Sequence, residues 1–175
     1  MKILKNTLFI VGLLALNTAQ AVDEKIYVET GYISATYREP LLWFTHGMAA
    51  LRIGYQFNNY FSVEGQFATA LTNAAGYVGS TYVTAKIDNS YGLSLKLQTE
   101  PSNGMSVYGK LGMNSGTVSA ATSYGSVWAG GTSPTYGLGA KYEADRIYYS
   151  FEYMSFYAQN GVTITGPSLN LGYKF

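Results

Sequence analysis

Seven charged side chains are the strongest candidates for chemistry in this sequence. They are three carboxylates and four bases, and each occupies the polar side of an alternating segment: Glu29, Arg52, Glu64, Lys96, Lys110, Lys141 and Glu152. If these polar sides face one enclosed interior, an unpaired charge there would be costly, so the charges must pair. The order of the segments predicts that Arg52 bridges Glu29 and Glu64, and that Glu152 pairs with Lys110 or Lys141. The plainest role for such a network is to fill the interior.

A hydrolase or acyltransferase site would need a histidine beside a serine and a carboxylate. The only histidine of the chain is His46, and Asp88 and Ser90 are its candidate partners. No recognisable motif surrounds these residues, so we expect no catalytic residue and no enzyme. The chain has no cysteine and no cluster of histidines, so we expect neither a metal site nor a cofactor.

Trp43 and Phe44 are the candidates for contact with a partner. They lie in a predicted loop with Arg38, Glu39 and His46, which makes it the only long loop that combines charge with large aromatic residues. Large aromatic side chains often anchor protein partners, and they also lie at the level of the lipid headgroups. The sequence leaves both interpretations open.

The composition is typical of neither a nucleic-acid-binding protein nor an average soluble domain. Charged residues make up 12% of the chain, against about 25% in soluble domains. Residues 1–21 place Lys2 and Lys5 before a short apolar run and the triplet Ala19, Gln20, Ala21. This pattern predicts a secretory signal peptide, followed by one domain over residues 22–175. Its removal leaves a chain with almost balanced charge, so nucleic acid is not an expected partner.

Period-2 alternation of apolar and polar residues dominates the remaining chain and predicts eight strands. They cover residues 26–36, 48–57, 60–71, 86–98, 105–115, 135–143, 147–153 and 169–175. The connections after the second, fourth and sixth strands are short, whereas the others are longer and rich in Gly, Ser, Thr, Ala and Asn. Short turns at one end and long loops at the other are typical of an up-and-down antiparallel order.

The apolar face of these strands is expected to meet lipid. The opposite face carries few charges and many small residues, which suits a narrow barrel interior better than a surface in water. The strands are long enough to cross a membrane, and aromatic residues cluster toward their ends. In hydrocarbon an unpaired backbone amide is costly, so the sheet must close on itself. We therefore predict an all-β fold, an eight-stranded antiparallel up-and-down transmembrane β-barrel.

The chain resembles the small outer-membrane β-barrels of Gram-negative bacteria, the group of the OmpA transmembrane domain, OmpX and Ail. The segment YQFNNYFSVEG and the ending LNLGYKF carry the resemblance, together with the leader and the eight strands. It implies a location in the outer membrane, contact with lipid and lipopolysaccharide, a monomer, and a structural role with surface interaction through the long loops. The peptidoglycan-binding domain of full OmpA proteins is not expected here.

The same resemblance implies two alternative functions and an assembly signal. Some outer-membrane barrels modify lipid A, and OmpA-type interiors suggest a narrow ion path, gated by rearranging charge pairs. The terminal pattern Leu169, Leu171, Tyr173 and Phe175 resembles the signal read by the barrel-assembly machinery. A host or other surface ligand remains an expected partner of the loops.

Overall fold

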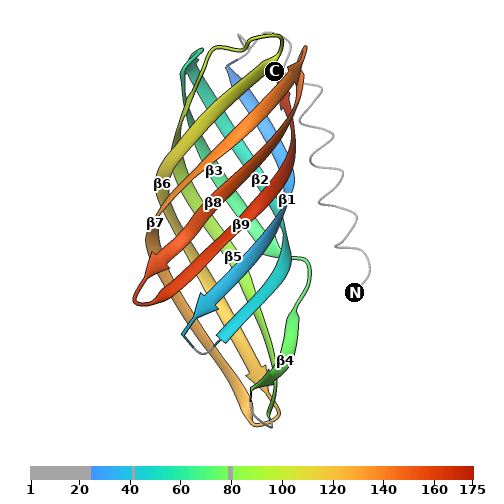
Figure 1. Cartoon of the computed structure of the whole chain (residues 1–175), viewed down its shortest axis with the longest axis vertical. Coiled ribbons are helices and arrows are strands. Elements are labelled where there is room, and N and C mark those ends of the chain that lie inside the picture. The colour runs from blue at the N-terminus through green and yellow to red at the C-terminus, as the bar shows by residue number, and fades with distance from the viewer. Residues whose placement is uncertain (1–24, 41, 79–80) are drawn as a thin grey trace.

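The computed structural model describes residues 25–40, 42–78 and 81–175, so the predicted signal peptide lies outside the described residues. The strands wind around one axis as a closed antiparallel sheet (Figure 1). Their bounds are β1 (Ile26–Glu39), β2 (Leu42–Asn58), β3 (Phe61–Ala70), β4 (Ala74–Val78), β5 (Thr81–Gln98), β6 (Met105–Thr122), β7 (Gly125–Ala144), β8 (Ile147–Gln159) and β9 (Val162–Lys174). None of the described residues forms a helix of the length and hydropathy that a membrane crossing requires.

Two pairings close the sheet into a ring. β1 pairs with β9, from Tyr27 opposite Lys174 to Arg38 opposite Thr163, and β3 pairs with β5. The short strand β4 pairs with β5 beyond the end of β3 and adds no further strand to the ring. Eight strands therefore encircle the interior, and the predicted eight-stranded antiparallel barrel is confirmed.

The outer surface of the barrel carries a belt of exposed aliphatic side chains. Leu51, Ile53, Leu93, Leu95, Leu111, Leu138, Leu169 and Leu171 are all between 46 and 74% exposed. Tyrosine and phenylalanine flank the belt, with Tyr55, Phe57, Tyr142 and Tyr149 toward one end and Tyr32, Phe67, Tyr91, Tyr136 and Tyr153 toward the other. An apolar band between two aromatic girdles is the surface that a bilayer requires of a barrel. The predicted outward face is thus the observed one.

The prediction of long loops at one end is wrong, because strands occupy most of those residues. β6 continues to Thr122 and β7 begins at Gly125, so only residues 123–124 separate the two strands. β8 and β9 are joined by Asn160 and Gly161, both at positive φ, as a two-residue hairpin turn requires. Beyond the apolar belt most outward-facing residues of these strands are small or polar, so the outward apolar alternation that marks a membrane strand ends there.

The two ends of the barrel differ. The turn end carries the short β2–β3, β5–β6 and β7–β8 turns and Phe175, and the hairpin end carries the tips of the other hairpins. In Figure 1 the hairpins of β4–β5 and β6–β7 extend farther at the hairpin end than those of β1–β2 and β8–β9. β7 pairs with β8 only from Tyr136, opposite Ser155, onward. The stretch of β7 from Gly125 to Thr132 therefore has a ladder with β6 alone among the described strands.

The interior changes from charged to apolar along the axis, and β1 shows the change within one strand. Near the turn end, Glu29 is buried and Leu171 of β9 faces outward beside Thr30. Near the hairpin end, Ile33 and Ala35 are the buried residues, at 1 and 0% exposure. The apolar positions thus switch from the outer to the inner face in the middle of the strand.

Candidate functional site

Two carboxylates hold Arg52 in the centre of the barrel. Its guanidinium contacts Glu29, its neighbour across the β1–β2 ladder, and Nη2 lies 2.6 Å from Oε1 of Glu152. Nε donates a 2.7 Å hydrogen bond to Oε1 of Gln66. The side chains of Arg52, Glu29 and Glu152 are at most 2% exposed. Arg52 therefore joins strands on opposite sides of the interior.

Two lysines complete the ion network. Lys110 Nζ lies 2.5 Å from Glu64 and 2.8 Å from Glu152, and Lys96 Nζ lies 3.0 Å from Glu64. Both lysines and both carboxylates are buried. We call Glu29, Arg52, Glu64, Lys96, Lys110 and Glu152 the ion network. Its three carboxylates balance its three cations, as removal of charge from water requires.

The structure brings together six of the seven predicted charges and confirms the pairing of Glu152 with Lys110, but it changes one predicted partner of Arg52. Arg52 contacts Glu29, as expected. Its second carboxylate is Glu152 on β8 instead of Glu64 on the adjacent β3, so that part of the prediction is wrong. An eight-stranded barrel is narrow enough for a long side chain to reach across it. Pairing by strand neighbourhood is therefore an incomplete guide inside such a barrel.

Lys141, the seventh predicted residue, lies apart from this network at the turn end. Its Nζ lies 2.7 Å from Glu143 and 3.3 Å from Oε1 of Gln98. Lys174 also contacts Glu143. Glu143 was not singled out in the sequence, because it ends a strand next to a turn. These residues form a second, smaller cluster between the ion network and the turn end of the barrel.

Three tyrosines surround the ammonium of Lys96 between the two clusters. Nζ lies 4.3 Å from the ring centre of Tyr108, 5.3 Å from that of Tyr27 and 5.9 Å from that of Tyr148. Such distances give attractive cation–π contacts. Tyr27 also donates a 2.7 Å hydrogen bond to Glu64. Charged and aromatic side chains thus fill the interior at this level, and the arrangement suits a closed barrel better than an open pore.

His46 is not a loop residue, as the sequence predicted, but a buried residue of β2. Its Nε2 accepts a 3.2 Å hydrogen bond from the backbone N–H of Ile87, where the register of β5 and β6 shifts. Ser90 donates to Oδ1 of Asn114, and Asp88 pairs with Lys86. The three residues considered for a catalytic triad therefore have separate partners. The described residues contain no group of three or more side chains suited to a metal ion.

Trp43 and Phe44 also lie in β2 and not in a loop, and they face opposite sides. Trp43 is 69% exposed, with the Arg38 guanidinium 5.2 Å from its ring centre. Phe44 stacks on Tyr37, with ring centres 4.8 Å apart, and lines the interior. Of the two predicted contact residues, only Trp43 is presented to the outside.

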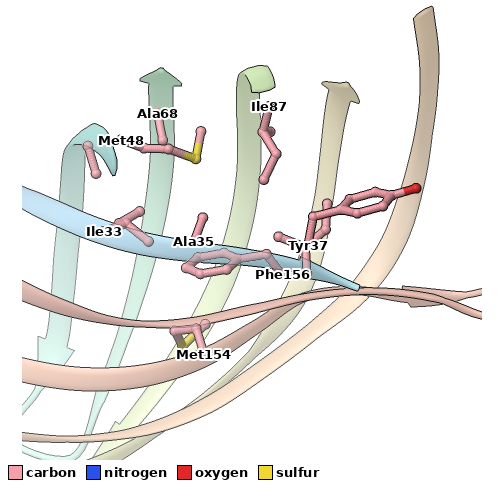
Figure 2. Close-up of a cluster of buried hydrophobic side chains, with 10 residues drawn as sticks. Ile33, Ala35, Tyr37, Met48, Ala68, Ile87, Met154 and Phe156 are labelled. Carbon is pink, nitrogen blue, oxygen red and sulfur yellow. The ribbon is translucent and has the colours of Figure 1, made fainter. Parts of the chain in front are cut away.

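An apolar chamber in the hairpin half of the barrel is the main feature that the sequence interpretation missed. Its wall includes Ile33, Ala35, Met48, Ala68, Ile87, Phe156 and Ile164, all buried. Figure 2 shows the first six of these side chains. The residues that line the chamber enclose a cavity of about 470 Å³. The switch of apolar residues to the inner face of β1 is the sequence pattern that would have revealed it.

Three residues of the predicted assembly signal lie along the outer face of β9, and the fourth, Phe175, directly follows the end of this strand. Leu169 and Leu171 are exposed, and the rings of Tyr173 and Phe175 meet edge to face at 5.1 Å. The N–H of Phe175 donates to the carbonyl of Ile26, 3.0 Å away, at the start of β1. These residues thus border the pairing of β9 with β1 that closes the barrel.

Comparison with known families gives one match that covers almost the whole chain. The model of the outer membrane protein beta-barrel domain family matches residues 7–175. No curated protein sequence matches the chain.

Solved barrels share the fold at low sequence identity. Ail, the attachment invasion locus protein of Yersinia pestis, was solved in complex with the heparin analogue sucrose octasulfate; it is 21% identical, with a TM-score of 0.65 over 86% of this chain and 98% of that chain. Neisserial surface protein A is 15% identical, with a TM-score of 0.63 over 86 and 97%. The N-terminal barrel domain of Pseudomonas aeruginosa OprF is 15% identical, with a TM-score of 0.59 over 85 and 97%.

Proposed function

The chain belongs to the outer membrane protein beta-barrel domain family and lies in the outer membrane, and we propose that it acts there as a structural protein that makes contacts at the cell surface. Barrels of this kind place short turns in the periplasm and longer extensions outside, so the hairpin end, where β6 and β7 project farther, faces the exterior. We further propose that the protein is a monomer, performs no catalysis, and carries a cleaved signal peptide over residues 1–21. Leu169, Leu171, Tyr173 and Phe175 are proposed to direct it to the barrel-assembly machinery.

The observation that carries the surface role is the projecting β6–β7 hairpin. Tyr124 at its tip is 91% exposed, and Val127 and Trp128 are 68 and 74% exposed. Next to them the β7 edge from Gly125 to Thr132 has no β8 partner in the described pairings. Exposed aromatic residues anchor many protein interfaces, and an open strand edge can accept a strand from a partner. Both features support contact with a protein on another surface.

The charge pattern argues against a polyanion as the partner. No residue between Ser115 and Pro134 is charged. Elsewhere at the hairpin end, Arg38 lies over Trp43 and Lys86 pairs with Asp88 at 2.9 Å. Binding of sulfated polymers depends on clustered cations. The heparin analogue bound by Ail is therefore not proposed as a ligand of this protein.

Adherence of bacteria to cultured epithelial cells tests the proposed surface role. Cells producing the wild type should adhere more than non-producing cells. The variant Tyr124→Ser/Trp128→Ser should lose this gain, and added heparin should not compete. The variant Trp43→Ser serves as a matched control with one exposed aromatic removed from the β1–β2 hairpin. Equal adherence of wild type and the double variant, at equal surface amounts, would refute the role of the hairpin.

A further inference from the structure

The apolar chamber lies between the ion network and the hairpin end of the barrel. Its lining comes from both sides of the barrel, with Ile33 on β1 and Phe156 on β8 facing Ile87 on β5 and Val118 on β6. Figure 2 shows such side chains converging on one interior space from several strands. The volume of about 470 Å³ falls within the range of about 300–1,000 Å³ of small-molecule sites.

Small residues on one wall keep this space open. On β6 and β7, Gly116 stands opposite Gly131, and on β5 and β6, Ala85 stands opposite Ala120. All four line the chamber. Residues of this size cannot reach the aliphatic and aromatic side chains on the opposite wall, and unfilled space of this kind forfeits packing contacts. A chamber that serves only as protein core would be filled more fully.

At the end of the chamber next to the ion network, the polar side chains already form hydrogen bonds within the protein. Ser90 donates a 2.8 Å hydrogen bond to Oδ1 of Asn114, and Nδ2 of Asn114 donates to the carbonyl of Phe156 at 3.3 Å. Gln66 accepts from Arg52. None of these groups carries a charge that a ligand must neutralise. In the adjoining ion network, the three carboxylates balance the three cations.

The mouth of the chamber selects against negative charge. Among the described residues that line the chamber, Glu39 is the only ionisable acid or base other than tyrosine, and it accepts a 3.0 Å hydrogen bond from the hydroxyl of Tyr37. Val127 and Trp128, both exposed, also belong to the lining. An apolar molecule can therefore pass from an apolar rim into an apolar interior, whereas an anion would meet a carboxylate and no cation.

We propose that the apolar chamber is a binding site for a neutral, mainly hydrocarbon small molecule that enters from the cell exterior. This inference goes beyond the proposed surface role. The two share Val127 and Trp128 at the chamber mouth, but the chamber extends into the barrel to Ile33, Ile87 and Phe156, which the surface role does not use. The probe for its test is N-phenyl-1-naphthylamine, which is neutral and apolar. Its anionic counterpart is 8-anilinonaphthalene-1-sulfonate.

Isoleucine methyl groups distinguish binding in the chamber from partition into lipid. Ile33, Ile87 and Ile164 line the chamber, whereas Ile53 and Ile147 face outward at 57 and 44% exposure. With the folded protein in lipid nanodiscs, the neutral probe should shift the three inner methyl resonances in a saturable way. The anionic probe should bind at least tenfold more weakly. Saturable shifts confined to the outer methyls, or no saturable shift at all, would overturn the proposal, as would equal affinity for the two probes.

Filling the chamber gives an independent test. Ala85→Phe/Ala120→Phe places two rings in the space, and Ala120→Phe alone is the milder variant, used if the pair fails to fold. Ala121→Phe is the matched control, because Ala121 is the exposed neighbour on the same strand and does not line the chamber. The filled variants should lose at least tenfold in affinity for the neutral probe and the control should not. Unchanged affinity in a folded filled variant would refute the chamber as the site.

Discussion

The ring of Tyr108 lies over Gly139, its partner across the β6–β7 ladder, so closely that a side chain at position 139 would collide with it. Tyr27 lies in the same way over Gly54, and Tyr148 over Gly172, each pair in cross-strand register. These three tyrosines are the ones that surround Lys96. The glycines therefore determine where the aromatic rings lie, and the rings in turn position a cation of the ion network.

Gly139→Ala should destabilise the barrel by about 1–3 kcal/mol, because the added methyl group must displace the Tyr108 ring in a packed interior. Gly109→Ala is the matched control, since a Cβ there would meet Leu138 at an ordinary 3.6 Å. Urea unfolding in lipid vesicles, followed by gel mobility without boiling, measures both. Equal midpoints for the two variants would contradict the close packing of Tyr108 on Gly139.

Arg52→Ala should cost about 3–5 kcal/mol, because it leaves the buried carboxylates of Glu29 and Glu152 without their shared cation. Lys86→Ala removes a cation whose side chain is 40% exposed beside Asp88, and such surface pairs contribute about 0–1 kcal/mol. The same unfolding assay compares the two. An Arg52→Ala protein as stable as the wild type would show that Arg52 does not bridge these carboxylates.

The wild type should show no steady conductance in planar bilayers, because the ion network and the tyrosines around Lys96 fill the interior. Arg52→Ala/Glu29→Ala removes one cation with one carboxylate and so keeps the remaining network balanced. This variant should admit water and produce discrete current steps. A wild type that conducts as well as the variant would favour the ion-channel alternative.

His46→Ala should destabilise the protein by about 1–3 kcal/mol, because the backbone N–H of Ile87 loses its acceptor inside the barrel. Thr45→Ala is the control, since the Thr45 hydroxyl forms a 2.9 Å hydrogen bond with the Thr36 hydroxyl at the protein surface. Lipid A from cells that produce the wild type, His46→Ala or neither protein should have the same mass spectrum. A mass change that requires His46 would instead support the lipid A-modifying alternative.

Phe175→Ser should lower the amount of folded protein in the outer membrane several-fold, because the terminal aromatic residue belongs to the proposed assembly signal. Phe175→Trp keeps an aromatic ring beside Tyr173 and should preserve assembly. Immunoblots of outer-membrane fractions, run with and without boiling, give the folded amount. Equal amounts of folded Phe175→Ser and wild type would remove Phe175 from the signal.

The membrane-spanning half of the fold was predictable from the sequence, since lipid outside and charge inside give a strong alternation. Leu51 and Ile53, the two sequence neighbours of Arg52, are apolar and face outward, and the alternation therefore turns Arg52 inward. Its contact with Glu29 followed from adjacent strands, whereas its contact with Glu152 did not. That second contact depends on the diameter of the closed barrel, which strand order alone does not provide.

The hairpin half was not predicted, because its apolar residues face inward and its polar residues outward, the reverse of the membrane-spanning half. On β1, Thr30 and Tyr32 face outward nearer the turn end, and Ser34 and Thr36 occupy the equivalent outward positions nearer the hairpin end. A wall that faces water on the outside and apolar contents on the inside has the pattern of a soluble barrel. The outward apolar pattern of the first strand therefore ends at Thr36, and the residues that follow have the composition of a loop. His46, Trp43 and Phe44 were misplaced for the same reason.

The ion network crosses the barrel on the turn-end side of the apolar chamber. The described interior is therefore a blind-ended well, which opens at the hairpin end and so on one side of the membrane only. A solute that enters from outside must leave by the same mouth. Its dwell time then depends on escape from the well and not on transit across the membrane, and no gradient between the two sides can drive it through. Such a geometry suits retention or sensing at the cell surface better than uptake.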